Sequence, residues 1–595
     1  MNSYKAPVGE MQFALLDVLE AESQYAKLGI EHATRDIIEA VLEEGARFNE
    51  QVLAPLNMSG DEEGCGFDKA TGQVTTPKGF KEAYTQFTDG GWPGLTAPET
   101  YGGQHLPESI GALIKEMIDA ANLAWGNYPL LSHGATEALK HHGEEWQREV
   151  FLRPIVEGRW TGTMCLTEPH CGSDLGLLKT RAEPRADGTH AISGTKIFIT
   201  AGEHDMTENI VHLVLARLPD APAGTKGISL FIVPKIRTAR DGALGEANAV
   251  RCGSIEHKMG IHASATCVMN FDEAEGYLIG QPNRGLNAMF TMMNTARLAV
   301  GIQGLGLIER AYQNALKYSN ERLQMRSLSG PKAPDKPADP LIVHPDIRRM
   351  LLTCKTLADG GRMMALDAAM QVDALERSTD EAERRAADEL LGFLTPIVKA
   401  CLTEWGVECT YHALQCFGGH GYVREWGMEQ LARDARITTI YEGTTGIQAL
   451  DLLGRKVIQL QGAGLKQFLG RIVEFCSAHT QNAELAEFIA PLAQSAQDWQ
   501  QLTLEVGKRI MADPEELGAA SVDYLFYSGY VALAYYWARA VAAAQRKGDA
   551  ELFQRKRGMA RFYYGRVLTR CRLHASNVLA GAGSLMELDA EAFAA

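Results

Sequence analysis

The eleven cysteines of this sequence include no C-x-x-C pair, and the closest two, Cys165 and Cys171, are separated by residues that favour a turn. This spacing argues against a structural zinc site, and we expect no bound metal. Eleven is also an odd number, and a chain of 595 residues does not need disulfide bonds to fold. We therefore predict reduced thiols and a cytoplasmic location.

Long apolar runs are missing as well. The longest, Val531 to Ala544, is interrupted by Arg539, so we expect a buried or amphipathic helix there and no transmembrane segment. The first residues contain no basic region followed by an apolar run, so we expect no secretory signal.

An excess of positive charge is also absent. The net charge of -16 disfavours nonspecific binding to nucleic acid and to anionic lipid. One basic segment departs from this balance and is interleaved with Phe562, Tyr563 and Tyr564; its members are Arg555, Lys556, Arg557, Arg561, Arg566, Arg570 and Arg572. We interpret this basic segment as a solvated or interdomain face, with a membrane-surface or nucleic-acid patch as the alternative.

The hydrophobic periodicity divides the chain into four parts. Helical spacing changes to short β-branched runs at Trp160, and helical spacing returns after Gly285. We therefore predict a multidomain α+β protein, whose parts are an N-terminal helical domain (1–159), a central antiparallel β-barrel or sandwich (160–280), a four-helix-bundle-like α domain (281–460) and an additional C-terminal helical domain (461–595). No repeated βα unit is apparent, which argues against a nucleotide-binding Rossmann sheet.

Several irregular segments interrupt these parts. We expect loops from Asp61 to Phe80 and, because of its prolines, from Arg326 to His344, and a helix break near Asp513. The pair His141-His142 is interpreted as part of a polar loop, because no third ligand lies at a metal-site spacing.

The segment from Ile437 to Gln448 holds one carboxylate, Glu442, among apolar, hydroxyl and glycine residues. Apolar neighbours raise the pKa of a carboxylate by desolvation, and Gly443 allows a ligand or the backbone to approach. Glu442 is therefore a candidate general base, although an exposed Glu at a helix start is the commoner explanation of such a pattern.

Seven motifs occur together in an order that is similar to that of the acyl-CoA dehydrogenase family, and the resemblance covers roughly residues 80 to 460. They are Met164-Cys-Leu-Thr-Glu-Pro-His-Cys-Gly-Ser-Asp174, Gly194-Thr-Lys-Ile-Phe-Ile-Thr200, Lys258-Met-Gly260, Asn294-Thr-Ala-Arg297, Tyr318-Ser-Asn-Glu-Arg322, Gln415-Cys-Phe-Gly-Gly-His-Gly421 and Tyr441-Glu-Gly-Thr444. The long N-terminal lead and the C-terminal block resemble the large members, such as those that act on 3-(methylthio)propanoyl-CoA or on long-chain acyl-CoA.

The resemblance implies FAD as the cofactor, held between the β domain and the helix bundle and completed by a neighbouring subunit. On the β side, Met164, Cys165, Leu166, Thr167 and Ser173 would line the flavin and pyrophosphate, Phe198 and Ile199 would lie at the ring system, and Thr200 would hydrogen-bond near N5. Arg322, Gln415, Gly418 and Gly419 would hold the partner's FAD, and Thr444 and Gln448 would meet its adenosine part. The segment from Phe417 to Gly421 also has the residues of a helix C-cap, which is compatible with this role.

The same resemblance implies that Glu442 removes the α-proton of a saturated acyl-CoA while the β-hydride passes to flavin N5, which gives a trans-2-enoyl-CoA. Some relatives place the base where this chain has Ala296, which cannot accept a proton. Arg297 would orient Glu442 or stabilise its charge. The implied substrate contacts are made by Ser173, Asn294, Arg297 and Gly443.

The implied electron acceptor is an electron-transfer flavoprotein, and the implied assembly is a homodimer, or a tetramer, that shares FAD sites. Candidate substrates are 3-(methylthio)propanoyl-CoA and medium- or long-chain fatty acyl-CoA, which places the enzyme in fatty acid β-oxidation or a related pathway. The alternatives are an acyl-CoA oxidase that reduces oxygen directly and a DNA-binding flavoprotein relative without dehydrogenase activity, against which the acidic net charge argues.

Overall fold

The computed structural model describes residues 3–594, and the chain forms two compact units. Unit 1 contains the chain up to Ala46, Glu108–Ala120 and the chain from Val300 onward, and unit 2 contains Arg47–Pro107 and Ala121–Ala299. The long helices α6 (Glu108–His142) and α9 (Gly285–Glu321) each contribute residues to both units. Inside α6, Asn122 departs from helical geometry, and its Oδ1 accepts the N–H of Trp125 at 3.0 Å, which caps the part of the helix that belongs to unit 2.

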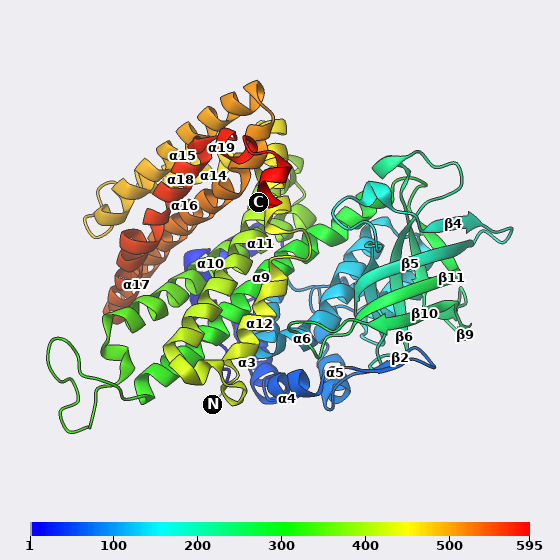
Figure 1. Ribbon diagram of the computed structural model, residues 1–595, viewed down its shortest axis with the longest axis horizontal. Helices are drawn as coiled ribbons and strands as arrows, with labels where there is room; N and C mark the ends of the chain where they lie inside the picture. Colours follow the sequence, from blue (N-terminus) through cyan, green and yellow to red (C-terminus); the bar gives the residue numbers. More distant parts are fainter. Residues whose placement is uncertain (1–2, 595) are drawn as a thin grey trace. The chain divides into compact units, whose positions relative to one another are not determined.

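Unit 2 is built around a seven-stranded sheet that begins at Trp160, as the periodicity predicts. Its strands pair in the order β3-β6-β7-β11-β5-β4, and β10 also pairs with β11 (Figure 1). Their bounds are β3 (Trp160–Cys165), β4 (Arg181–Pro184), β5 (His190–Thr200), β6 (Asn209–Ala216), β7 (Ser229–Pro234), β10 (Val250–Ile255) and β11 (Thr266–Ile279).

The strand pairs of this sheet are antiparallel, as predicted, except for one. Strands β3 and β6 run parallel, with Trp160 opposite Asn209 and Cys165 opposite Val214. A parallel pair needs a long connection between its strands, and the chain between β3 and β6 supplies it by forming β4 and β5 on the other side of the sheet. Hairpin spacing along the sequence did not reveal this crossover.

One predicted loop is partly ordered into strands. Between Asp61 and Phe80, β1 (Gly66–Asp68) pairs with β2 (Gln73–Thr75) in an antiparallel hairpin between α4 (Leu56–Glu63) and α5 (Phe80–Asp89). The Asp68 carboxylate accepts the N–H of Ala70 at 2.8 Å and the hydroxyl of Thr71 at 2.9 Å, which stabilises the turn. The predicted excursion between helices is therefore present, and part of it forms a short hairpin.

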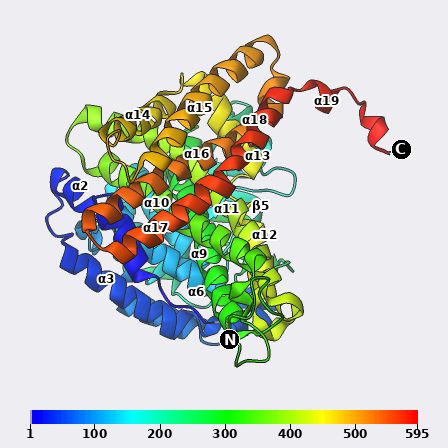
Figure 2. The same ribbon diagram turned by 90° about the vertical axis from the view of Figure 1, so that its left-hand side faces the viewer.

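Unit 1 is helical throughout its described length apart from loops. Its N-terminal helices are α1 (Val8–Gln12), α2 (Ala21–Lys27) and most of α3 (Arg35–Phe48). Besides parts of α6 and α9, its central helices are α10 (Pro345–Arg377), α11 (Glu381–Phe417), α12 (Met428–Thr438) and α13 (Thr445–Leu450). The C-terminal helices are α14 (Ala463–Ala478), α15 (Ala486–Ala512), α16 (Glu515–Lys547), α17 (Ala550–Phe562), α18 (Cys571–Ala580) and α19 (Gly583–Met586), the last of which extends away from the other helices of the unit (Figure 2). The predicted order of helices, strands and helices with an additional helical block is thus confirmed.

Two long apolar helical segments are core helices. The stretch Val531–Ala544 lies within α16 and is buried except for Arg539, which donates to the Val18 carbonyl at 2.5 Å. The segment Glu381–Tyr422 is long and apolar enough to cross a membrane, but 78% of its most apolar window is buried inside the protein. That burial is typical of a core helix rather than a membrane span.

The loop after α9 and the break after α15 lie where the prolines place them. Asp339 is fully buried in the loop and accepts the backbone N–H groups of Ser327, Lys332 and Ala333 at 2.7–2.9 Å. Helix α15 ends at Ala512, and α16 begins at Glu515. One buried aspartate therefore organises a loop that was predicted only to be irregular.

A network of buried charges joins distant parts of unit 1. Arg362 on α10 donates to Glu116 at 2.6 Å and to Glu309 at 2.8 Å, and it also pairs with Asp359. Lys556 of the basic segment pairs with the same Asp359 at 3.3 Å and with Glu10 near the start of the chain.

Other members of the basic segment are also paired. Arg557 and Arg561 donate to Glu487 at 2.8 and 2.7 Å, and Arg570 donates to Glu408 at 2.5 Å. These contacts fit the interpretation of the basic segment as a face between helical parts of the protein.

Candidate active site

The strongest candidate catalytic group is Glu442, in the turn between α12 and α13 of unit 1. Its backbone has φ 56°, and Gly443 follows with φ 86°. The side chain is half-buried, and its Oε2 atom is buried. A non-glycine residue in the left-handed region costs about 1–2 kcal/mol, so the surrounding structure must hold Glu442 in this conformation.

Hydrogen bonds from neighbouring side chains hold this turn at successive residues. The hydroxyl of Tyr441 donates to Gln303 Oε1 at 2.5 Å, and Gln448 Nε2 donates to the Glu442 carbonyl at 2.9 Å. Two further tethers come from α11, where Lys399 Nζ donates to the Gly443 carbonyl at 2.6 Å and Glu404 Oε1 accepts the hydroxyl of Thr445 at 2.6 Å. The turn is therefore fixed on both sides of the carboxylate.

Two properties of the turn restrict its chemistry. A Cβ atom on Gly443 would lie 2.6 Å from Gln448 Nε2, so only glycine fits there. Burial, with the nearby carboxylates of Asp119 and Glu442, raises the pKa of Tyr441 well above its usual value. The Tyr441 hydroxyl therefore keeps its proton at neutral pH and remains a hydrogen-bond donor to Gln303.

Thr444 and Gln448 have structural positions in this chain. The hydroxyl of Thr444 accepts the N–H of Ile447 at 3.2 Å and caps α13, while the residue stays exposed. Gln448 has no exposed surface. In this conformation Gln448 holds the turn through the Glu442 carbonyl, and its contact with adenosine stays a prediction.

On the β side, strand alternation separates the predicted cofactor residues. Met164 and Thr167 are half-buried, whereas Cys165 is fully buried and Leu166 is 9% exposed. Ile199 is 2% exposed, next to a half-buried Thr200. Because successive strand side chains point to opposite faces, the side chains of Cys165 and Ile199 point into the core, and their predicted contact with the flavin would be made by the backbone.

Phe198 is displaced from the regular strand by a β-bulge. Ile199 pairs with Cys267 and Lys196 with Met269, so two residues of β5 face one residue of β11. Phe198 has φ 58° and is 60% exposed, which is unusual for a large aromatic residue. The bulge therefore presents a planar ring to solvent beside the half-buried Thr200.

A buried ion pair that the motifs did not reveal anchors this region. Lys196 is fully buried and donates to Glu168 Oε1 at 2.9 Å and to the Leu166 carbonyl at 3.0 Å. Glu168 also accepts the hydroxyl of Thr180 at 2.6 Å. Burial opposes the charge of Glu168, but Lys196 and these hydrogen bonds outweigh it and lower the pKa of Glu168 to about 2.

Glu168 and Lys196 each lie inside one of the seven family motifs. The available signal was therefore one acidic and one basic residue in neighbouring motifs. Ser173, in the same loop as Glu168, is exposed.

A second group of predicted residues gathers at one end of unit 1. Arg322, Gln415, Gly418 and Gly419 are all exposed. The ring of Tyr318 stacks on Phe417 at 4.1 Å, and the Tyr318 hydroxyl lies 2.9 Å from His420 Nδ1. These contacts bring the end of α9 to the end of α11.

The glycines in this group leave their backbone accessible. Gly418 ends α11 with φ 59° and ψ -137°, and Cβ atoms on Gly418 or Gly419 would meet nothing within 4 Å. An open backbone of this kind suits a ligand or a partner surface.

The predicted substrate residues on α9 differ in exposure. Asn294 is exposed, Arg297 is 7% exposed, and Ala296 is 5% exposed. Ala296 therefore occupies a buried position that carries no ionisable group.

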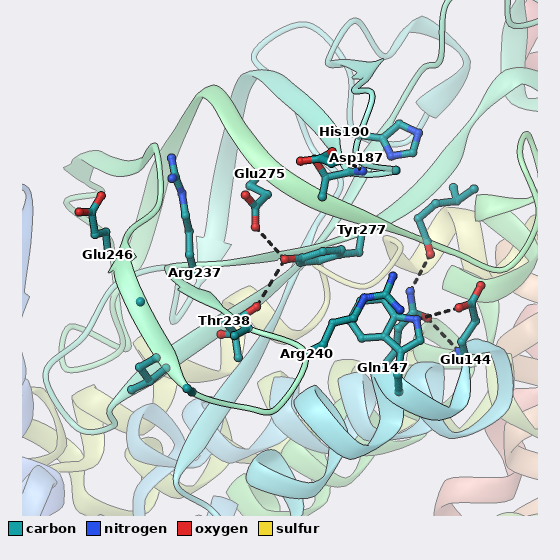
Figure 3. A pocket seen from close by; sticks show the side chains of 18 of the residues that line it. Glu144, Gln147, Asp187, His190, Arg237, Thr238, Arg240, Glu246, Glu275 and Tyr277 are labelled. Carbon is teal, nitrogen blue, oxygen red and sulfur yellow. Dashed lines mark hydrogen bonds between the residues drawn. The ribbon is translucent and has the colours of Figure 1, made fainter.

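Unit 2 also contains a cavity of about 800 Å³ away from these motifs in sequence (Figure 3). Tyr277 donates to Glu275 at 2.7 Å within it, and the Arg240 guanidinium lies 4.6 Å from the centre of the Trp146 ring. The residues that line it in the described chain include none of the predicted site residues. We assign no chemistry to this cavity.

Family models match this chain over nearly all of its length. The N-terminal, middle and C-terminal domain models of acyl-CoA dehydrogenase match residues 38–159, 163–274 and 283–457, and the acetyl-CoA dehydrogenase C-terminal-like model matches residues 468–589. A curated relative, the 3-methylmercaptopropionyl-CoA dehydrogenase of Ruegeria pomeroyi, is 42% identical over 98% of this chain and 99% of its own. The chain belongs to the acyl-CoA dehydrogenase family of oxidoreductases.

Other relatives agree with this assignment. The broad-specificity linear acyl-CoA dehydrogenase FadE5 of Mycobacterium tuberculosis is 33% identical over 95% of this chain and 94% of its own. Among solved structures, an acyl-CoA dehydrogenase of Bacillus anthracis complexed with FAD has a TM-score of 0.74 at 20% identity, over 92% of this chain and 89% of its own. The second similarity supports the fold, including the C-terminal helical block.

Proposed function

We propose that this acyl-CoA dehydrogenase removes the α- and β-hydrogens of a saturated acyl-CoA to form a trans-2-enoyl-CoA, with Glu442 as the base. The observation that supports this most directly is the turn itself, which holds a half-buried carboxylate in a left-handed conformation by side-chain hydrogen bonds. Such preorganisation is useful when a weakly acidic proton must be removed at a fixed position.

The residues present suit FAD as the cofactor. Phe198 offers an exposed ring beside Thr200, Ser173 offers an exposed hydroxyl, and Gly418 and Gly419 offer open backbone. When bound, FAD supplies the acceptor for the β-hydride. Met164, Thr167, Ser173, Phe198 and Thr200 are the residues of unit 2 that we assign to it.

Because Arg322, Gln415, Gly418 and Gly419 are all exposed in a single chain, we assign them to the FAD of a second copy. This assignment makes the active protein a homodimer or a larger even assembly. Light scattering of the flavin-loaded protein would contradict it by giving the mass of a monomer.

For the substrate we propose 3-(methylthio)propanoyl-CoA or a linear acyl-CoA of similar length. The support is the 42% identity over the whole chain to the relative named for the first thioester, against 33% to the broad-specificity relative. The test is a panel of acyl-CoA thioesters of increasing length that includes the methylthio compound. A preference for long chains by more than tenfold in kcat/KM would contradict the proposal.

We propose an electron-transfer flavoprotein as the electron acceptor. Turnover with an electron-transfer flavoprotein or an artificial dye should exceed peroxide formation in air. Stoichiometric peroxide would instead identify an oxidase.

The role of Glu442 is tested with Glu442→Gln, with Glu442→Asp as the matched control that keeps the charge. Anaerobic flavin reduction by a good acyl-CoA should slow by about 10²–10⁴-fold in Glu442→Gln, the usual contribution of a general base. A wild-type rate in Glu442→Gln would remove Glu442 from the mechanism.

A second readout separates proton removal from hydride transfer. The α-carbon of 3,3-dimethylbutanoyl-CoA carries hydrogens while its β-carbon carries none, so this thioester cannot be dehydrogenated. The wild-type enzyme should exchange its α-hydrogens with deuterium in D2O, and Glu442→Gln should not.

A further inference from the structure

Lys399 is a buried cation next to the catalytic turn that none of the sequence motifs includes. It lies on α11 in the apolar run Leu394-Thr-Pro-Ile-Val-Lys-Ala-Cys-Leu402 and has no exposed surface. Helix α11 packs against α12 and α13, the two helices that flank the turn (Figure 2). Its Nζ donates to the Gly443 carbonyl at 2.6 Å.

This contact acts on the most adaptable part of the turn. Gly443 has no side chain to restrict its φ and ψ, and a change at Gly443 would let Glu442 relax from φ 56° toward a common conformation. A hydrogen bond from an ammonium group is stronger than one from a neutral donor, and burial protects it from competition by water.

Other tethers of the turn do not replace Lys399. Gln448 holds the carbonyl of Glu442, and Glu404 holds the hydroxyl of Thr445. Lys399 is the donor to the carbonyl between them, which fixes the peptide that follows Gly443. Because a trans peptide directs its N–H opposite to its C=O, this bond also turns the N–H of Thr444 away from Lys399.

We infer that Lys399 is a positioning residue for the dehydrogenation, which holds Gly443 so that the Glu442 carboxylate stays aligned with the α-proton of the substrate. The inference rests on the proposed role of Glu442 as the base. In this role Lys399 acts on the turn through the Gly443 carbonyl.

The test is Lys399→Met, which keeps the length of the side chain and removes the ammonium group. We expect the rate constant of anaerobic flavin reduction to fall by about 10²-fold, the loss that a misplacement of about 1 Å produces. The apparent Kd of the acyl-CoA and the FAD content should stay within about twofold of the wild-type values. The isotope effect with α-deuterated substrate should rise, because proton removal becomes more strongly rate-limiting.

A second readout uses the thioester without β-hydrogens. Deuterium uptake at the α-carbon of 3,3-dimethylbutanoyl-CoA should slow in Lys399→Met by a factor similar to that of flavin reduction. This measurement does not depend on electron transfer.

The matched control is Lys355→Met. Lys355 is also a buried lysine of unit 1, on α10, and pairs with Asp359 one turn away at 2.8 Å. This variant should melt at a lower temperature but keep the wild-type rate constant and isotope effect. Loss of stability alone reduces the amount of active enzyme and changes neither quantity.

The outcomes separate the two proposals. If Glu442→Gln keeps the wild-type rate, the proposed function fails. If Glu442→Gln is inactive while Lys399→Met has an unchanged rate constant and isotope effect, only the inference about Lys399 is overturned. Should Lys399→Met fail to fold, Lys399→Leu removes the donor with a smaller side chain, and a wild-type rate constant in that variant would overturn the inference as well.

Discussion

Glu442 and Phe198 adopt nearly the same unusual backbone conformation, with φ 56° and 58°, but the protein holds them in different ways. Glu442 lies in a turn fixed by side chains from other helices, among them Lys399 and Gln448. Phe198 lies on a bulge fixed by the backbone pairing of β5 with β11. The first is half-buried, and the second is 60% exposed.

The difference indicates what each position requires. A base must be aligned to a fraction of an ångström, and several independent side-chain tethers provide that alignment. A ring that packs on a flat cofactor must only be held at the right distance from the cofactor plane. The strand register of a sheet sets that distance. We therefore expect distant side chains to control the chemistry at Glu442 and the integrity of the sheet to control Phe198.

The largest expected effect concerns the buried ion pair between Lys196 and Glu168, next to the bulge in β5. In Lys196→Met the buried Glu168 loses its cationic partner, which should lower the free energy of unfolding by about 3–5 kcal/mol. Urea unfolding followed by tryptophan fluorescence measures this loss. The double variant Lys196→Met with Glu168→Gln should recover part of it, and an additive double variant would show that the two residues are not coupled.

Acid should weaken the same region. The pKa of Glu168 is lowered from 4.5 to about 2 in the folded protein, so between these pH values the unfolded chain binds a proton that the folded chain does not. Its stabilisation, about 3 kcal/mol, is therefore complete above pH 4.5 and is lost as the pH falls toward 2. Melting temperatures between pH 3 and 6 measure the effect, and Glu168→Gln should flatten this part of the profile.

The next effect concerns the catalytic turn. Gly443→Ala places a Cβ atom 2.6 Å from Gln448 Nε2 in a left-handed conformation, which should cost about 1–3 kcal/mol and slow flavin reduction at least tenfold. The control is Gly446→Ala in the same segment, where the nearest atom is 3.8 Å from the new Cβ. Equal rates in the two variants would contradict the proposed rigidity of the turn.

The smallest effect concerns Phe198 itself. Phe198→Gly should remove the strain of the positive φ and raise the stability of the flavin-free protein, by at most about 1 kcal/mol, while weakening FAD binding. Phe198→Ala keeps the strain and should weaken FAD binding without the gain in stability. Flavin release on dilution and melting of the flavin-free protein measure the two properties separately, and unchanged FAD affinity in both variants would remove Phe198 from the cofactor site.

Local patterns in the sequence were sufficient to predict the main architecture. The change of period at Trp160 marks the first strand of the seven-stranded sheet, and the prolines after Arg326 mark a loop. These features depend on neighbouring residues, whose spacing is visible in the sequence. The turn that holds Glu442 could be found for the same reason, because its glycine and hydroxyl residues are adjacent.

Features that depend on distant partners were not predictable. The bulge at Phe198 is a mismatch of register between β5 and β11, and neither strand shows it alone. Lys399 contacts a residue that follows it by a full helix and loop, and its sequence context is an ordinary buried helix. The burial of the Cys165 side chain, by contrast, follows from strand alternation, which the sequence does show.

The buried charges around Arg362 also have a consequence for how the protein is made. Glu10, at the beginning of the chain, pairs directly with Lys556 near its end, and Lys556 also pairs with Asp359, which pairs with Arg362. During translation at about 5–20 residues per second, Glu10 leaves the ribosome on the order of half a minute or more before its partner exists. The chain of unit 2 is complete at Ala299, so unit 2 can fold while the N-terminal helices of unit 1 still wait for their C-terminal partners. A truncated chain that ends before Lys556 would lack this partner of Glu10, and we expect its N-terminal helices to be cut more readily by proteases than those of the full chain.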